Sequence, residues 1–238
     1  MTPPPTATDK VVEYEYLLPA EFDRRKAEHP VVYQPIGCME WHGKHLPLGL
    51  DGLKAFAICK RTALAYGGIV MPTIHWGIHG PFRMLPVHQS HNLYLDENVF
   101  GSLMTEVCDQ LEAVGFRVVV LLTGHYPKLQ GKFLNQLAEQ QTLRHHQKIK
   151  ILVPDEDEVA AALGQEGDHA GTWETSLLME LYPDLVKMER LDDLVGIISK
   201  TDPRVASSRE LGSRACEWYV HHIGKQIQGA LADLEADR

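Results

Sequence analysis

The side chains through which this sequence could do chemistry are its histidines and carboxylates. Thirteen of the 238 residues are histidine, and Asp and Glu together number 32. Glu40 and His42 are two residues apart, so on an extended chain they point to the same side, and Asp51 and His125 add a second carboxylate and a second imidazole. This mixed nitrogen and oxygen set suits zinc, manganese or iron rather than copper(I) or an iron–sulfur cluster.

Each of these residues taken singly has a simpler interpretation. Asp51 could be only the N-cap of the helix that follows it, and His42 and His45 could be ordinary loop residues. The glycines and the proline between His42 and Asp51, however, favour a tightly shaped loop rather than a plain connector. The pattern as a whole therefore favours a metal site.

A metal site needs elements that bring these residues together, and the sequence predicts alternating strands and helices. The predicted strands cover residues 31–38, 68–76, 117–122 and 148–154, and the predicted helices cover residues 51–66, 96–115, 128–147, 172–181 and 207–235. Such alternation is typical of an α/β fold with a mainly parallel sheet, in which ligands bind at the carboxyl ends of the strands. Glu40, His42, Asp51 and His125 all fall at that edge of the predicted sheet.

The remaining patterns concern the last predicted helix, an acidic run and the limits of the domain. Apolar residues recur every four positions in the last predicted helix and favour packing against the sheet over a seam between subunits. The acidic run at residues 155–158 predicts a charge-stabilised helix start. With no internal repeat or convincing linker, we expect a flexible tail at residues 1–10 and a single domain over residues 11–238.

Three segments resemble the signature motifs of the creatininase (creatinine amidohydrolase) family. Residues 40–51, EWHGKHLPLGLD, resemble the first signature, which reads roughly E-x-H-G-x-H-L-P-x-G-x-D. Residues 123–125, TGH, resemble the N-G-H element, and residues 168–176, DHAGTWETS, resemble the H-A-G-x-x-E-T-S element. The first motif is very specific, the order of the three agrees, and the resemblance spans about residues 31–190.

The resemblance implies a three-layer α/β/α sandwich with a mainly parallel central sheet and two divalent metal ions (Zn, Mn or Fe). In the family, the Glu, His and Asp of the first motif and the His of the N-G-H element are ligands, with the Asp bridging both ions; these match Glu40, His42, Asp51 and His125. Creatininase itself has a further Glu two residues after that His, where this sequence has Pro127. Other branches use the Glu of the third motif, so Glu174 is the expected fifth ligand, and the second metal site is weakened if Glu174 only begins a helix.

The resemblance also implies roles around the metals. Two metal ions would hold a hydroxide at neutral pH and polarise a substrate carbonyl, and His169 is the expected acid that protonates the leaving nitrogen. The alternative for His169 is a purely structural role. His45 is expected to orient a ligand, and Tyr126, Trp173 and His88 are expected to contact ligands or substrate.

Four histidines fall in one loop that contains Gly and Pro, at positions 75, 79, 88 and 91. Their spacing across turns favours a lid over the pocket or a contact between subunits over an independent metal site. Three polar residues of this loop could contact a polar substrate: Arg83, His88 and Asn92.

These motifs predict a metal-dependent hydrolase that uses a metal-bound hydroxide to cleave a C–N bond, in an amide, cyclic amide or formamide, of a small polar substrate. Two alternatives stay open: a family hydrolase acting on a lactone or a cyclic polyol ketone, and a non-enzymatic metal-binding scaffold, which Thr123 and Pro127 motivate. A nucleotide-binding protein is disfavoured, because no G-x-G-x-x-G or P-loop follows the first predicted strand. The resemblance further implies a homo-oligomer, often a hexamer.

Composition excludes other classes of function. The formal net charge of −9 disfavours binding to nucleic acid or to an anionic membrane. The four cysteines are widely spaced, which disfavours a zinc knuckle and favours free thiols in a reducing compartment. Without the pattern of a signal peptide or a membrane-spanning run, the sequence predicts a cytoplasmic protein.

Overall fold

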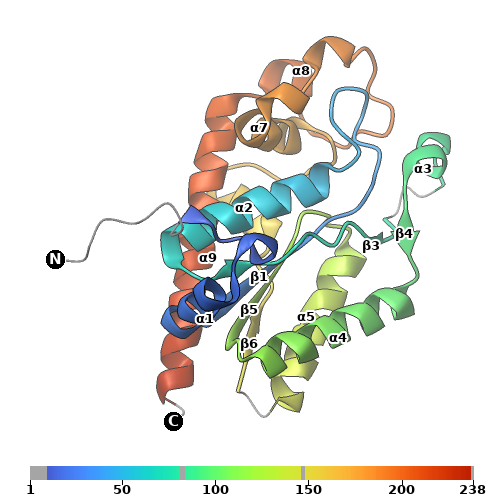
Figure 1. Cartoon of the computed structure of the whole chain (residues 1–238). Helices are drawn as coiled ribbons and strands as arrows, with labels where there is room; N and C mark the ends of the chain where they lie inside the picture. The colour runs from blue at the N-terminus through green and yellow to red at the C-terminus, as the bar shows by residue number, and fades with distance from the viewer. Residues whose placement is uncertain (1–9, 81–83, 146–147, 237–238) are drawn as a thin grey trace.

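Four parallel strands form the central sheet of the computed structural model, which describes residues 10–80, 84–145 and 148–236 (Figure 1). Their order is β2-β1-β5-β6, with bounds Ile69–Val70 for β2, Val31–Ile36 for β1, Val118–Thr123 for β5 and Lys150–Leu152 for β6. β1 and β5 pair over their whole lengths, from Val31 opposite Val118 to Ile36 opposite Thr123. The two strands therefore end side by side at one edge of the sheet.

Helices cover both faces of this sheet, as Figure 1 shows. On one face, Val31, Tyr33 and Val120 pack against α2 (Leu50–Tyr66) and α9 (Arg209–Ala236). On the other face, the alternate residues of the same strands pack against α4 (Glu97–Val114) and α5 (Lys128–Arg144). Successive side chains of a strand point to opposite faces and both faces are covered, so β1 and β5 are buried along their whole lengths and are mostly apolar, with Gln34 and Thr123 as the polar exceptions. The predicted three-layer α/β/α sandwich is confirmed.

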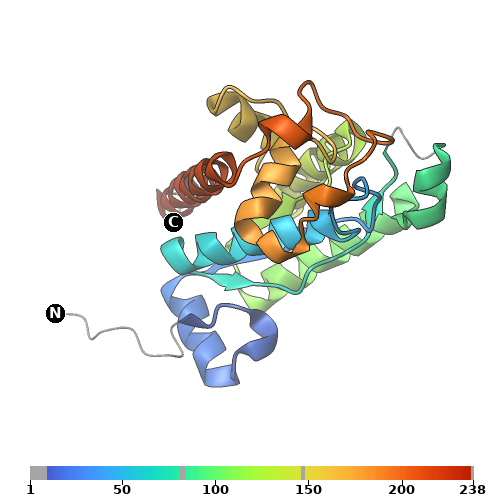
Figure 2. The same ribbon diagram turned by 90° about the horizontal axis from the view of Figure 1, so that it is seen from above.

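The smaller elements complete the two helical layers and the edge of the sheet. α7 packs against α9 and α2 (Figure 2). The bounds are α1 Pro19–Glu28, α3 Pro86–His91, α6 Glu156–Ala162, α7 Thr172–Leu181, α8 Pro203–Ala206, β3 Gly77–Ile78, β4 Tyr94–Leu95, and the 3-10 helices η2 Tyr14–Tyr16, η3 Pro183–Leu185 and η4 Met188–Arg190.

Expectations about the second strand, the loop after it and the start of the following helix differ from the structure. The second strand is only two residues long, and the predicted long loop that follows it contains β3, α3 and β4. Asp51 is not an N-cap, because α2 begins at Leu50 after Gly49, and the Asp51 side chain is buried. The acidic run at residues 155–158 begins α6, as predicted, and Glu156 within it is buried.

The C-terminal helix packs inward, as its periodicity predicts. Ala215, Tyr219, Ile223 and Ile227 lie in the core that α2 and the sheet share. Of the expected flexible tail, residues 1–9 lie outside the described residues, as does Arg83.

Candidate metal centre and cavity

The ends of β1 and β5 and the start of α2 meet at one point above the sheet. The loop after β1 carries Glu40 and His42, the turn after β5 carries His125, and the first turn of α2 carries Asp51. The backbone of Gly124 touches the Asp51 carbonyl so closely that a Cβ at this position would overlap it. A glycine is therefore required beside His125 for the turn to reach α2.

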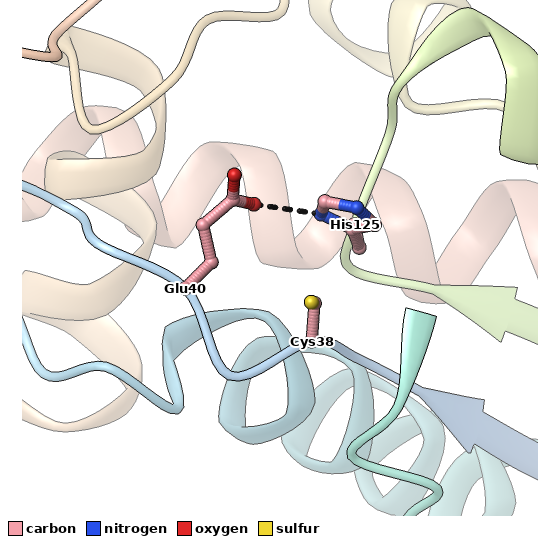
Figure 3. A group of neighbouring side chains, drawn as sticks. All are labelled: Cys38, Glu40 and His125. Atoms are coloured by element: carbon pink, nitrogen blue, oxygen red, sulfur yellow. Dashed lines mark ion pairs between the residues drawn. The ribbon is translucent and has the colours of Figure 1, made fainter. Parts of the chain in front are cut away.

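Asp51 lies at the centre of this group, and its two oxygens face different imidazoles. Oδ1 is 3.0 Å from Nε2 of His42, and Oδ2 is 3.1 Å from Nδ1 of His125. Nδ1 of His125 is also 2.9 Å from Oε2 of Glu40, an ion pair that Figure 3 shows. All four side chains are buried. A carboxylate in this position can bridge two cations that each also contact one imidazole.

Backbone carbonyls hold both imidazole rings in place. Nε2 of His125 is 2.9 Å from the carbonyl oxygen of Ile78, and Nδ1 of His42 is 3.0 Å from that of Glu40. A carbonyl only accepts, so these nitrogens carry the hydrogen and donate it. The other nitrogen of each ring then faces the carboxylates, which is the arrangement found in metal-ligating histidines.

The second oxygen of Glu40 is occupied by residues around α3 and β4. Oε1 of Glu40 accepts hydrogen bonds from the Tyr94 hydroxyl at 3.1 Å and from the Asn92 amide at 3.3 Å, and Nδ1 of His88 lies 3.5 Å away. Oε2 is the oxygen that faces His125. Asn92, expected to contact substrate, instead holds a candidate metal ligand, and His88 reaches the site from α3.

Glu174 joins the group from the first turn of α7. Its Oε2 accepts a hydrogen bond from the backbone nitrogen of Ala170 at 2.8 Å and lies 3.7 Å from Nε2 of His42. Its Oε1 accepts a hydrogen bond from the Lys54 ammonium at 2.8 Å. Ala170 has a φ of 54°, a left-handed conformation that is costly for a residue with a Cβ. The strained backbone directs its N–H at Glu174.

Without a bound metal, protons on the two imidazoles offset part of the negative charge of the site. Burial alone would lower the pKa of His42, but the charges of Asp51 and Glu174 outweigh it and raise the pKa to about 9. The pKa of His125 is likewise raised by Asp51 and Glu40 against the effect of burial. Burial acts to raise the pKa values of Glu40 and Asp51, but the neighbouring histidines lower both. Divalent cations would replace the protons of the two imidazoles. Three carboxylates and two imidazoles that converge in this way fit a metal centre.

A cavity of about 740 Å³ opens directly onto this group. Its walls include His169, Tyr126, Pro127 and Glu156. Nε2 of His169 donates to the carbonyl oxygen of Trp41 at 2.8 Å, which leaves Nδ1 as the nitrogen that can take or give a proton. Burial and the charge of His42 lower the pKa of His169. His169 is therefore placed to act on a bound molecule.

Two of the predicted site residues lie elsewhere. Trp173 is fully buried in the core beneath α9, away from the cavity that it was expected to line, because the first turn of α7 directs Glu174 and Trp173 to different sides. His45 contacts Thr175 through Nε2 at 3.0 Å rather than a candidate ligand, and burial and the charge of His42 lower its pKa to about 4.

Besides Tyr94, three side chains near the site were missed by sequence reasoning. Cys38, at the end of β1, lies close to Glu40 and His125 and could offer a thiolate to the same metal ion (Figure 3). Burial raises the pKa of this thiol to about 12. Glu156 was missed because nothing in the sequence distinguishes it from a surface charge, and Lys54 was missed as well. For Lys54 alone a signal existed, since it lies one helical turn after Asp51 on the predicted helix.

Comparison with known proteins identifies the family. The family model Creatininase, described as creatinine amidohydrolase, matches residues 15–227. A creatinine amidohydrolase of Pseudomonas putida is 30% identical over 194 residues, which cover 73% of each chain. The chain belongs to the creatininase family. It is therefore a hydrolase, and the interpretation as a non-enzymatic scaffold is not supported.

Solved creatininases share the fold of this family member. The structure named Creatininase Mn has a TM-score of 0.76 and 25% identity, covering 92% of this chain and 98% of that one. A mutant creatininase of Zn-Zn type has a TM-score of 0.74 and 26% identity, covering 92% and 97%. A mutant creatininase complexed with creatine has a TM-score of 0.73 and 25% identity, covering 92% and 98%.

This creatininase-family chain departs from the family motif at the turn after β5. Thr123, in place of Asn, donates a hydrogen bond to the His125 carbonyl at 2.7 Å and accepts one from Gln130 at 2.8 Å. Gln130 also accepts from the backbone nitrogen of Ile78 at 2.9 Å. The turn that positions His125 is therefore held by a threonine and a glutamine. In the described part of the chain, no helix is long and apolar enough to cross a membrane.

Proposed function

We propose that this chain is a metal-dependent amidohydrolase that cleaves a C–N bond of a small polar substrate. The proposed ligands of two divalent metal ions are Glu40, His42, Asp51, His125 and Glu174. The observation that carries the proposal is the pair of backbone-anchored imidazoles that face the two oxygens of Asp51. The relatives named for zinc, manganese and creatine support it.

Two divalent ions bound there would supply a nucleophilic water at neutral pH and polarise the substrate carbonyl. The chain's own residues do the rest. His169 lines the cavity with its Nε2 fixed on the Trp41 carbonyl, so Nδ1 is the atom that would first accept a proton from the attacking water and then pass it to the leaving nitrogen. Tyr94 and Asn92 hold Oε1 of Glu40, so that Oε2 stays directed at the site.

Elemental analysis and a substrate panel test this function. The full chain would be loaded with zinc or manganese and assayed with creatinine, other cyclic amides, formamides and lactones. We expect near-stoichiometric metal and turnover of a C–N substrate, both lost in Asp51→Ala and retained in the control Asp192→Asn, whose side chain is exposed. Turnover of lactones alone would favour the alternative reaction, and metal retained in Asp51→Ala would contradict the proposed ligand set.

Assembly and location complete the proposal. We expect a homo-oligomer, and a hexamer is the stoichiometry to test first. Light scattering of the purified chain measures the mass of the assembly directly. A cytoplasmic location stays a prediction, tested by fractionation of cells that express the chain.

A further inference from the structure

Glu156 is a buried carboxylate that lines the cavity but belongs to none of the proposed metal ligands. It lies in the first turn of α6 and is 2% exposed, whereas its neighbours Asp155, Asp157 and Glu158 are exposed. The acidic run therefore places one of its four carboxylates inside the molecule. Burying a carboxylate is costly, so its partners and its orientation need a physical explanation.

One oxygen of Glu156 is fully engaged. Oε2 accepts hydrogen bonds from the Lys54 ammonium at 2.8 Å and from the Tyr219 hydroxyl at 2.9 Å. Lys54 also donates to Oε1 of Glu174 at 2.8 Å. A single ammonium thus bridges Glu156 and the candidate metal ligand Glu174, which fixes the two carboxylates within the reach of one small molecule.

The other oxygen of Glu156 has no such partner. Oε1 forms no hydrogen bond with any part of the chain that the structure describes, and it is not sealed within the protein, because Glu156 lines the cavity. A carboxylate oxygen accepts hydrogen bonds and cannot donate them when ionised. The cavity therefore presents an acceptor on the wall beside the candidate metal centre.

The surroundings of this acceptor favour a donor that carries positive charge. Asp157 adds a carboxylate to the cavity wall, and the Tyr126 ring lies 5.5 Å from the Lys54 ammonium. One ammonium, that of Lys54, is shared between the carboxylates of Glu156 and Glu174. These three groups together carry a net negative charge when all of them are ionised. Burial, opposed by Lys54 and Tyr219, raises the pKa of Glu156 to about 7, and a cationic partner would favour its ionised form.

We propose that Glu156 determines substrate specificity by accepting, through Oε1, hydrogen bonds from an amidinium-type or amino group of the substrate. The scissile bond would lie beside Glu40, Asp51 and Glu174 at the same time. This inference rests on the proposed function of the cavity, and it adds that the substrate carries N–H donors a few atoms from the bond that is cleaved.

Binding of small probes to the full chain tests the inference. Acetamidinium and guanidinium would be compared with the neutral molecules acetamide and urea by calorimetry, with and without added zinc. We expect wild type to bind the cations about tenfold more tightly than the neutral probes, and Glu156→Gln to lose this preference. Glu158→Gln removes the same charge from an exposed position of the same helix and is expected to keep it.

A further variant gives a result that does not depend on the folding of Glu156→Gln. Tyr219→Phe removes a hydrogen bond to Oε2 and leaves Oε1 in place, so it is expected to keep the preference for cations. Equal binding of cations and neutral probes by wild type, a preference that survives in folded Glu156→Gln, or its loss in Glu158→Gln would overturn the proposal. The metal content of the same samples separates this failure from failure of the proposed function.

Discussion

Nε2 of His42 lies 3.0 Å from Oδ1 of Asp51, with both side chains buried. The contact is an ion pair in the metal-free protein, because Asp51 raises the pKa of His42 to about 9 against the effect of burial. The same two atoms are proposed metal ligands. Metal and proton therefore compete for one nitrogen, and this competition governs the pH dependence of metal binding.

We predict that metal binding releases protons and strengthens as pH rises. At pH 7 His42 is protonated and must lose its proton to coordinate a metal, so affinity should increase up to about pH 9 and then level off. The stability that the ion pair gives the metal-free protein is complete below pH 6.5 and is lost as pH rises through about 9. Calorimetry in two buffers and chelator competition from pH 6 to 9 measure both effects. An affinity independent of pH would contradict the prediction, and His221→Gln, on an exposed position of α9, serves as the control.

Replacing His169 with Gln should slow turnover without removing metal. The proposed role of His169 is to protonate the leaving nitrogen, and loss of such a group lowers kcat by about 10²–10⁴-fold. Nitrogens of His169 and His42 and a Glu40 oxygen also lie close enough to share an ion. Metal content measured beside kcat decides between these roles: metal lost from His169→Gln would make His169 a ligand.

The Tyr94 hydroxyl should control metal affinity from outside the ligand set. Tyr94→Phe removes the hydrogen bond to Oε1 of Glu40, so Glu40 can turn away from the site. We expect metal affinity to fall about 10–100-fold, measured by competition with a chelator. Tyr16→Phe, at an exposed position, is the matched control and should change nothing. Identical chelator midpoints for the Tyr94 variant and wild type would show that the hydrogen bond does not hold the ligand.

Lys54 should contribute strongly to the stability of the metal-free protein. Lys54→Met removes the ammonium that both buried carboxylates of Glu156 and Glu174 contact, which costs about 3–5 kcal/mol. Adding Glu156→Gln removes one of these charges and should recover part of the loss. Urea unfolding measures the effect, and Lys60→Met, which breaks a partly exposed ion pair with Glu13, should cost at most about 1 kcal/mol. A Lys54→Met variant as stable as wild type would disprove this account.

Local sequence patterns predicted much of the fold. Strands at Val31–Ile36 and Val118–Thr123 and a helix at Thr172–Leu181 follow from apolar runs and helical periodicity, which depend on near neighbours alone. The segment after the second strand was predicted as a loop because β3 and β4 are two residues each and exist only by pairing with one another. Pairing of such short strands leaves no periodic signal.

Some residues of the candidate site could likewise be predicted from the sequence, and others could not. Glu40, His42, Asp51 and His125 are found from the sequence because motif spacing places them at the carboxyl ends of two strands, and the structure brings them together. Trp173 and Glu156 were misplaced, because a tryptophan next to a ligand and an acid in a charged run have the same local sequence whether they face the cavity, the core or solvent.

The sequence by itself determined the family motif and a candidate set of nitrogen and oxygen ligands on an α/β framework. Only the tertiary structure decided which oxygen of each carboxylate is free. Tyr94 and Asn92 occupy one oxygen of Glu40, and Lys54 links Glu174 to Glu156 from 120 and 102 residues away. The physical reason is that burial and charge pairing depend on how α2, α6 and α7 are oriented on the sheet, and no local pattern encodes the distance between side chains so far apart in the chain.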